Sequence, residues 1–339
     1  MKFVLVAIKL FCINEVFAQY LYHFTERDFY NQKDLINPSY VGLIDGSILN
    51  VNMRVLNQAL FSDFYNRAFV STISFNDKFG SKEMNGVGII IKDYRPKNFI
   101  ESETGLYTMY SRKFQLRENL IIYPSGSINL KHNYFDVVKL LSQNANIYSD
   151  SNQKKVNRYT YSMVFGTIMS INKINIGVSI SNLFKSKMYW INSNNDLPTW
   201  YNFSLDYIYQ LKKSNSFHFY LKYQNNRYSN NFRIQGDESI SFASYYCNKK
   251  WIVGGQIGLH SYYAEDFLQI LLPKELGFNF GYKLNHLSEI IVSKKGYLLS
   301  SGIVLFSSKL SYINSYEVSF KYKFLSQKAK EEISPVISR

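Results

Sequence analysis

The stretch "SYEVSFKYKF" (residues 315–324) alternates apolar and polar side chains along its whole length. Successive side chains of a β-strand point to opposite faces, so a period of two indicates a strand with one apolar face. A strand of a soluble β-sandwich can show the same alternation, but an aromatic-rich apolar face that persists to a terminal Phe fits contact with lipid better. The apolar face comprises Tyr316, Val318, Phe320, Tyr322 and Phe324, and the polar face comprises Glu317, Ser319, Lys321 and Lys323.

A second alternating stretch, "SILNVNMRV" (residues 47–55), lies near the other end of the chain. We expect the two stretches to be the first and last strands of one transmembrane β-barrel. A register slip of one residue would turn every side chain to the opposite face, so the facing of each residue is a strict prediction. The residues expected in the lipid-facing belt include Leu49, Val51, Met53, Val318, Phe320 and Tyr322, and those expected to face inward include Asn50, Asn52, Lys321 and Lys323.

The composition and the intervening sequence also favour an all-β membrane fold. Aromatic residues make up 17% of the chain, with 29 Tyr, and no run of apolar residues is long enough for a transmembrane helix. Only a closed barrel of strands can then satisfy the backbone inside a bilayer. We predict about fourteen antiparallel strands over residues 46–324, with twelve or sixteen as alternatives. Besides the two terminal strands they are expected near residues 67–76, 85–93, 103–114, 118–131, 158–170, 173–182, 199–211, 215–227, 231–246, 250–262, 275–285 and 297–306.

The connections between these strands are expected to alternate in length. "INKIN" (residues 171–175) and "LKKSNS" (residues 211–216) are typical of tight hairpin turns. Long loops on the extracellular rim and short turns on the periplasmic rim are typical of outer-membrane barrels, and an even strand number places both termini in the periplasm. The longer polar connections are expected at residues 131–158, which include a short helix at 136–143, and at residues 185–198 and 287–296.

The two ends of the chain are expected to lie outside the barrel. Lys2, an apolar run and Val16-Phe17-Ala18 predict an export signal over residues 1–18, cleaved after Ala18; a buried first strand is the alternative. Cys12 follows Phe11, whereas a lipidated cysteine follows a small residue. Removal of the signal leaves Cys247 as the only cysteine, which excludes an internal disulfide and a Cys-based zinc site. Residues 325–339 depart from the strand pattern and are expected to form a periplasmic tail.

The formal net charge of +14 raises the question of a nucleic-acid partner. Lys and Arg are scattered along the chain, whereas a nucleic-acid-binding surface gathers them on one helix or patch. A barrel lumen lined with basic groups, together with a Lys-, Asn- and Ile-rich composition typical of AT-rich coding sequence, accounts for the charge. We therefore expect no nucleic-acid partner.

The sequence carries no recognised catalytic or metal-binding motif. The stretch "GVGIII" (residues 86–91) lacks the third glycine of a dinucleotide fingerprint, and glycines where strands bend or pack closely explain it better, as they do "GGQIG" (residues 254–258). The five histidines show no metal-ligand spacing. We therefore expect a protein that is not an enzyme, with no catalytic, cofactor-binding or metal-binding residues and no cofactor.

Upstream of the first strand, "YLYHFTERDFYNQKDLINPSYVGL" (residues 20–43) closely resembles the start of the mature PorP/SprF family, the type IX secretion system membrane proteins. The stretches "NGVGIIIKDYRP" (residues 85–96), "GVSISNLF" (residues 177–184) and the closing strand are also similar to the family. Ser39 and Val41 depart from it, since many members have alanine there. The residues that match the N-terminal motif are Phe24, Thr25, Tyr30, Asn31, Asn37, Pro38, Tyr40 and Gly42.

The resemblance implies a non-enzymatic outer-membrane component of type IX secretion. Such a protein supports export or surface attachment of large adhesin-like cargo and, in gliding bacteria, motility. The implied partners are outer-membrane lipid, other type IX secretion components and the C-terminal domain of the cargo. One alternative is an outer-membrane channel for small or hydrophobic solutes, and another is a soluble exported β-sandwich that binds glycans.

Residues 19–45 form an irregular lead segment before the barrel. Pro38 fixes its own φ and disfavours a helical Asn37, so the pair predicts a turn. Tyr40 can pack its ring on apolar surface while its hydroxyl finds a partner, and Gly42 permits close approach. The segment is expected either to fold into the lumen or to brace the periplasmic rim, with a structural or a partner-binding role for the motif.

Overall fold

The computed structural model describes most of the expected barrel and part of the lead segment. The described residues are 33–44, 46–60, 64–80, 84–96, 101–135, 156–184, 187–190, 193–196, 199–212, 215–227, 238–261, 272–285, 287–299 and 311–324. The expected signal peptide, the expected helix at 136–143 and the tail at 325–339 lie outside these residues. The motif residues Phe24, Thr25, Tyr30 and Asn31 lie outside them as well.

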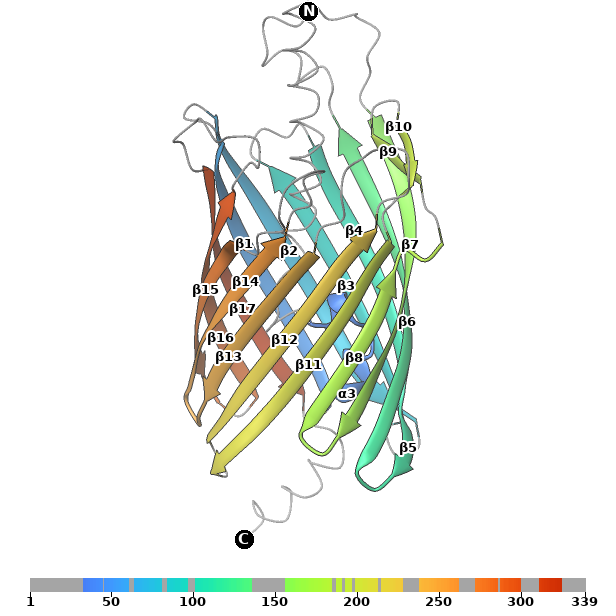
Figure 1. The fold of residues 1–339 in the computed structure, drawn as a ribbon, viewed down its shortest axis with the longest axis vertical. Helices are drawn as coiled ribbons and strands as arrows, with labels where there is room; N and C mark the ends of the chain where they lie inside the picture. Colours follow the sequence, from blue (N-terminus) through green and yellow to red (C-terminus); the bar gives the residue numbers. More distant parts are fainter. Residues whose placement is uncertain are drawn as a thin grey trace, which may run out of the picture.

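The described strands form a closed antiparallel barrel of fourteen strands, which confirms the predicted fold class (Figure 1). β1 pairs with β17, and β4 pairs with β6, so the ring has no free edge. The strands of the ring are β1 (Ser47–Leu60), β2 (Phe64–Phe79), β3 (Asn85–Pro96), β4 (Glu101–Arg112), β6 (Leu120–Phe135), β7 (Val156–Ile171), β8 (Ile174–Ser181), β11 (Thr199–Lys212), β12 (Asn215–Arg227), β13 (Glu238–Cys247), β14 (Trp251–Ser261), β15 (Leu272–Lys283), β16 (Ser288–Leu299) and β17 (Ser311–Phe324).

Three short strands add to this ring without changing its closure. β5 (Phe114–Arg117) follows β4 after Lys113 and pairs with the same neighbour, β6. β9 (Lys187–Trp190) and β10 (Ser193–Asp196) pair with each other in the connection between β8 and β11.

The first and last strands face the lipid and the lumen as their alternation predicts. Asn52 of β1 lies opposite Ser319 of β17, and both side chains are buried in the lumen. Met53, between two inward residues, is 64% exposed, and its partner Val318 is also exposed. Leu49, Val51, Phe320 and Tyr322 share the outward face, and Asn50, Lys321 and Lys323 share the inward face.

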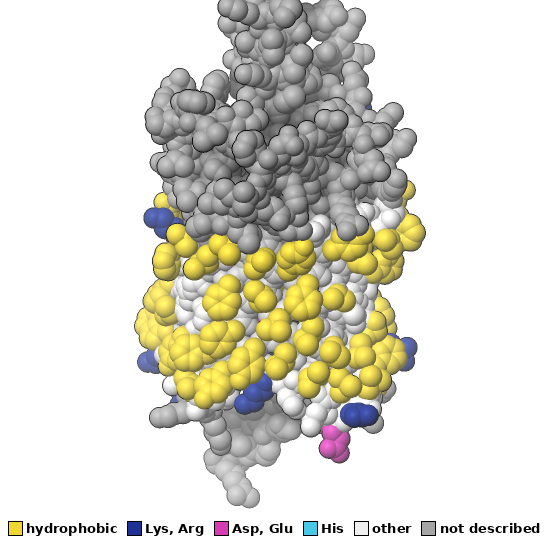
Figure 2. Space-filling model, in the orientation of Figure 1, with side chains coloured by type: hydrophobic (Ala, Val, Ile, Leu, Met, Phe, Trp, Pro, Cys, Tyr) yellow, Lys and Arg dark blue, Asp and Glu magenta, His cyan; other side chains and the backbone are white. Residues whose placement is uncertain are grey.

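A band of apolar side chains crosses the outside of the barrel on the face shown in Figure 2. Exposed apolar surface of this extent marks contact with membrane or another protein, because soluble monomers expose only small apolar patches. Polar side chains fill the lumen instead, in the inverted arrangement typical of membrane barrels. The exposed band includes Ile73, Ile91, Leu106, Leu130, Val178, Phe203, Phe242, Val253, Phe278, Phe280 and Val292.

No helix within the described residues is long and apolar enough to cross a membrane.

The two rims of the barrel differ in the length of their connections. β1 begins and β17 ends at the same rim, where Ser47 lies opposite Phe324. The turns at this rim are short, for example Asn172-Lys173 between β7 and β8, with Asn172 at φ 54° in the left-handed region. At the other rim β6 ends at Phe135 and β7 begins only at Val156. We call the first rim the short-turn rim.

The expected long connection at residues 287–296 is wrong, because β16 covers Ser288–Leu299. Ser293 and Lys295 are buried on the lumen side of β16, whereas Ile290 and Val292 face outward. A lumen lined by polar groups accepts this lysine and serine, so their polarity does not indicate a loop. The strand expected at residues 297–306 accordingly begins earlier, and the connection from β15 to β16 is a short turn. The connection expected at 131–158 is also shorter, since β6 extends to Phe135 and β7 begins at Val156.

Candidate functional site: the motif segment inside the lumen

Residues 33–44, which carry the second half of the N-terminal motif, lie inside the barrel near the short-turn rim (Figure 1). We call them the lumen segment. The segment consists of two single-turn helices, α2 (Lys33–Ile36) and α3 (Tyr40–Leu43). Between them the chain turns at Asn37-Pro38, where the Tyr40 amide donates to the Asn37 carbonyl at 3.1 Å. Of the two expected locations, the lumen and the rim, the structure shows the lumen.

Asn37 ties this turn to the barrel wall. Its side-chain Oδ1 accepts a hydrogen bond from the Ser39 amide at 3.0 Å, which closes the turn. Its Nδ2 donates to the carbonyls of Thr167 on β7 and Val178 on β8, at 3.3 and 3.1 Å. An asparagine side chain carries both a donor and an acceptor, so this one residue satisfies groups in its own turn and in two strands.

Hydroxyl groups make two further contacts between the lumen segment and the wall. Ser39 Oγ lies 2.7 Å from Ser125 Oγ on β6. Ser179 Oγ on β8 donates to the Ile36 carbonyl at 2.7 Å, at the end of α2. Ser39 is one of the departures from the family pattern, and an alanine there could not make the contact with Ser125.

Two charged residues of α2 bind strands on either side of the segment. Lys33 Nζ lies 2.6 Å from Asp206 Oδ2 on β11 and 4.7 Å from the centre of the Tyr220 ring on β12. Asn76 Nδ2 on β2 donates to Asp34 Oδ2 at 2.9 Å. These pairs hold α2 across the lumen, between β2 and β11.

The apolar residues of the segment pack in two separate clusters. Tyr40 is buried in a cluster that includes Tyr123, Ile168 and Tyr220. Val41, next in the chain, is buried in another cluster with Ile90 of β3. Adjacent residues thus anchor α3 on different parts of the wall.

Glycines allow α3 to approach the wall closely. A Cβ on Gly42 would lie 2.7 Å from Ser111 Oγ and 2.9 Å from the Tyr123 ring. On the facing strand β3, a Cβ on Gly86 would lie 2.5 Å from the Val41 carbonyl oxygen. A Cβ on Gly88 would lie 2.7 Å from Val41 Cγ1. The "GVG" of β3 therefore fits close packing against the lumen segment.

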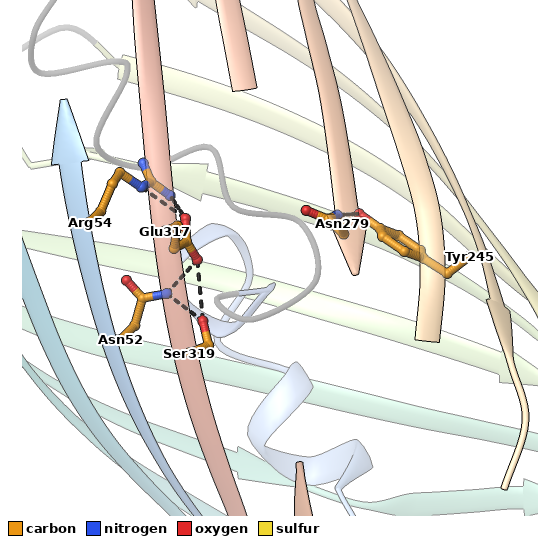
Figure 3. A network of polar contacts seen from close by, with 6 residues as sticks. All are labelled: Asn52, Arg54, Tyr245, Asn279, Glu317 and Ser319. Carbon is orange, nitrogen blue, oxygen red and sulfur yellow. Dashed lines mark hydrogen bonds and ion pairs between the residues drawn. The ribbon is translucent and has the colours of Figure 1, made fainter. Parts of the chain in front are cut away.

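Elsewhere in the lumen, buried polar groups connect neighbouring strands (Figure 3). Glu317 Oε2 of β17 accepts hydrogen bonds from Arg54 Nε and Nη2 of β1, at 2.9 and 2.7 Å. Asn52 Nδ2 donates to Glu317 and, at 2.6 Å, to Ser319 Oγ. Arg54 and Glu317 are 2% and 1% exposed, so this is a buried ion pair whose partners depend on each other.

The lumen also carries the basic groups that the charge predicts. The buried lysines with inward-facing side chains include Lys92, Lys131, Lys222 and Lys295. A cavity beside the lumen segment, bounded by Leu35 and Ile36, is lined by Lys131 and Lys222 and by several amide side chains. The lining suits polar or anionic groups better than hydrocarbon.

Within the described residues, no group of three His, Cys, Asp or Glu side chains is placed to hold a metal ion. His218 on β12 lies 2.9 Å from Ser216 Oγ, and Cys247 of β13 carries a buried thiol.

The motif itself can be found in the sequence, but its contacts on the wall cannot. Asp206, Ser125 and Asn76 are ordinary lumen residues of alternating strands, and they contact the segment only once the barrel closes. The Thr167 and Val178 carbonyls are backbone groups with no sequence signal. Gly86 and Gly88 were noticeable in advance, since two glycines in a strand indicate a close approach.

The model of the family "Type IX secretion system membrane protein PorP/SprF" matches residues 16–296. The chain belongs to this family. The match covers the lumen segment and most of the barrel. With its fold, the family places the PorP/SprF chain in the outer membrane. A comparison with curated protein sequences found no significant match.

Solved structures with a similar fold are outer-membrane barrels. The monoaromatic hydrocarbon channel CymD has a TM-score of 0.59 and 11% sequence identity, over 88% of this chain and 94% of that one. The P. putida toluene transporter TodX has a TM-score of 0.53 and 9% identity, over 86% and 93%. A Pseudomonas aeruginosa FadL homologue has a TM-score of 0.51 and 10% identity, over 85% and 93%. At these identities the likeness shows the barrel fold and nothing of the ligand.

Proposed function

We propose that this PorP/SprF barrel is a non-enzymatic component of type IX secretion that supports export or surface attachment of large adhesin-like cargo. In a gliding bacterium it would contribute to motility. The observation that carries the proposal is the docking of the family motif in the lumen through Asn37, Tyr40 and Gly42. In this proposal, the function depends on a barrel with a fixed internal element.

In this proposal the lumen segment gives the barrel a defined shape on its short-turn side, which we assign to the periplasm. The opposite rim carries the long connections, and we assign it to the cell surface, where the C-terminal domain of the cargo would bind. The assignment follows the rim asymmetry of outer-membrane barrels. Other secretion components would approach from the periplasm.

The second candidate function is a channel for small or hydrophobic solutes, and the fold of the hydrocarbon channels favours it. The lumen argues against a hydrocarbon path, because Lys131, Lys222 and Asn202 line the cavity beside the lumen segment. Apolar solutes gain little in such surroundings, and their entry would desolvate the lysines at a cost. We therefore favour secretion.

The test is to measure displayed cargo and assembled barrel together in cells that carry variants of the lumen segment. Pro38→Ala frees the backbone of the turn, and Tyr40→Ala removes an aromatic anchor. We expect both to reduce cargo on the cell surface more than they reduce the heat-modifiable barrel in the outer membrane. Tyr201→Ala, a matched change on the exposed outer face, should leave cargo display near normal.

Two outcomes would contradict a functional role of the segment. Equal loss of cargo and barrel would make the segment purely structural. Normal display with a normal barrel would make it dispensable. If deletion of the whole gene left cargo display intact, the proposed function itself would be wrong.

A further inference from the structure

A second cavity opens at the short-turn rim, and no residue of the lumen segment is among the described residues that line it. The segment contacts β2, β3 and β4, bonds to β6, β7, β8 and β11, and packs its Lys33 over the Tyr220 ring of β12. The cavity lies against the ends of β11, β13, β15 and β17 and the beginnings of β1, β12 and β16, and its volume is about 530 Å³. This is within the usual range of ligand pockets, roughly 300–1,000 Å³.

Lysines dominate the charge of this cavity, which we call the mouth pocket. Its lining includes Lys249, Lys283, Lys321 and Lys323, and Glu289 is the only acidic residue among the described residues that line it. Glu289 lies 3.0 Å from Lys321 and so offsets one of the four positive charges. Lys283 donates to the Asn248 carbonyl at 2.9 Å, which fixes its position without neutralising it.

The strands present these lysines to the lumen and away from the lipid. Lys321 and Lys323 continue the inward face of β17 that begins with the buried Ser315 and Glu317. Lys283 likewise continues the inward face of β15, two residues after the buried Gly281. The barrel wall therefore separates the pocket from lipid head groups, and its ligand must arrive from the aqueous side of the rim.

We propose that the mouth pocket binds an acidic peptide segment, a stretch with several Asp or Glu side chains on a soluble protein. The lysines come from β15, β17 and the turn after β13, so their charges are spread along one side of the cavity and match several carboxylates better than one small anion. Low-dielectric walls around a cleft of one charge sign also focus its field on an approaching partner. The proposal extends the proposed function by naming a partner surface, and its periplasmic location rests on the proposed topology.

Purified barrel in uncharged detergent and a fluorescent hexaglutamate peptide test the proposal. The double variant Lys283→Gln, Lys323→Gln removes two charges from the pocket. The matched control, Lys173→Gln, Lys250→Gln, removes two exposed charges of the same rim that do not line it. We expect the pocket variant to bind about tenfold more weakly, and the control to bind nearly as wild type, with affinity falling as salt rises.

Cys247 supplies a second readout, because its buried thiol lines the pocket. Hexaglutamate should slow modification of this thiol, and hexaglutamine of the same length should not. Heat-modifiable migration of every variant checks that its barrel has folded.

Three results would overturn the proposal. The first is that hexaglutamate does not bind, and the second is that both double variants weaken its binding equally. The third is that inorganic phosphate displaces the fluorescent peptide at the same concentration as unlabelled hexaglutamate does. The last would indicate a small-anion site. Because the assay uses neither cargo nor cells, its failure would leave the role in secretion standing.

Discussion

The carbonyl oxygen of Val41 occupies the space in which a side chain on Gly86 would have to sit. Gly86→Ala should therefore push α3 away from β3, with an overpacking cost of roughly 1–3 kcal/mol. The measurement is the urea midpoint of the barrel refolded in lipid vesicles. Gly126→Ala is the matched control, since the nearest atom to a Cβ at Gly126 is 3.8 Å away. Equal midpoints for the two variants would contradict the close contact.

The ion pair between Arg54 and Glu317 gives a second prediction for single residues, on the free energy of unfolding. Glu317→Gln leaves the buried guanidinium without its carboxylate, and we expect a loss of about 3–5 kcal/mol in the free energy of unfolding. Arg54→Met in the same chain removes the uncompensated charge and should restore much of that loss. A double variant less stable than Glu317→Gln alone would show that Arg54 does not depend on this partner.

Single residues also show how far the sequence alone can go. Asn37, Pro38, Tyr40 and Gly42 stand out as a motif, and Pro38 predicts the turn that the structure contains. Their partners do not stand out, because an inward Ser125 or Asp206 looks like any other lumen residue until β6 and β11 are placed around the segment.

At the scale of whole strands, the outward face of each strand must remain apolar at mid-membrane. Met53→Lys places a charge in the middle of the belt, and we expect a cost of about 2–4 kcal/mol in the free energy of unfolding in vesicles. Leu284→Lys, at another exposed position just beyond β15, should cost about 0–1 kcal/mol because it reaches the interface. Equal costs would mean that Met53 does not lie in the lipid-facing belt.

The strands also differ in how well their bounds can be predicted from the sequence. β1 and β17 alternate cleanly, since apolar residues face lipid and polar residues face the lumen. The sequence predicts a polar connection over residues 287–296, whereas β16 begins at Ser288. The lumen wall accepts Ser293 and Lys295, and Lys294 lies 5.6 Å from the Tyr316 ring on β17. Pairing with β15 and β17, which sequence periodicity does not report, determines this strand.

At the scale of the whole molecule, the proposed orientation predicts which rim a reagent outside the cell can reach. Lys173→Cys, in the turn between β7 and β8, should stay unlabelled by a membrane-impermeant maleimide in intact cells. Ser151→Cys, in the long connection between β6 and β7, should be labelled under the same conditions. The reverse pattern would place the short-turn rim at the cell surface.

The central claim is that the family motif docks inside the lumen, against β6, and a designed cross-link tests it most directly. Ser39→Cys with Ser125→Cys, in a Cys247→Ser background, replaces two hydroxyls whose oxygens lie 2.7 Å apart. We expect a disulfide between them on mild oxidation, seen as a reducible change in gel mobility, since such proximity suits disulfide geometry. Ser39→Cys with Ser293→Cys, on β16 across the ring, should give none. Absence of the first cross-link, or equal formation of both, would contradict the account.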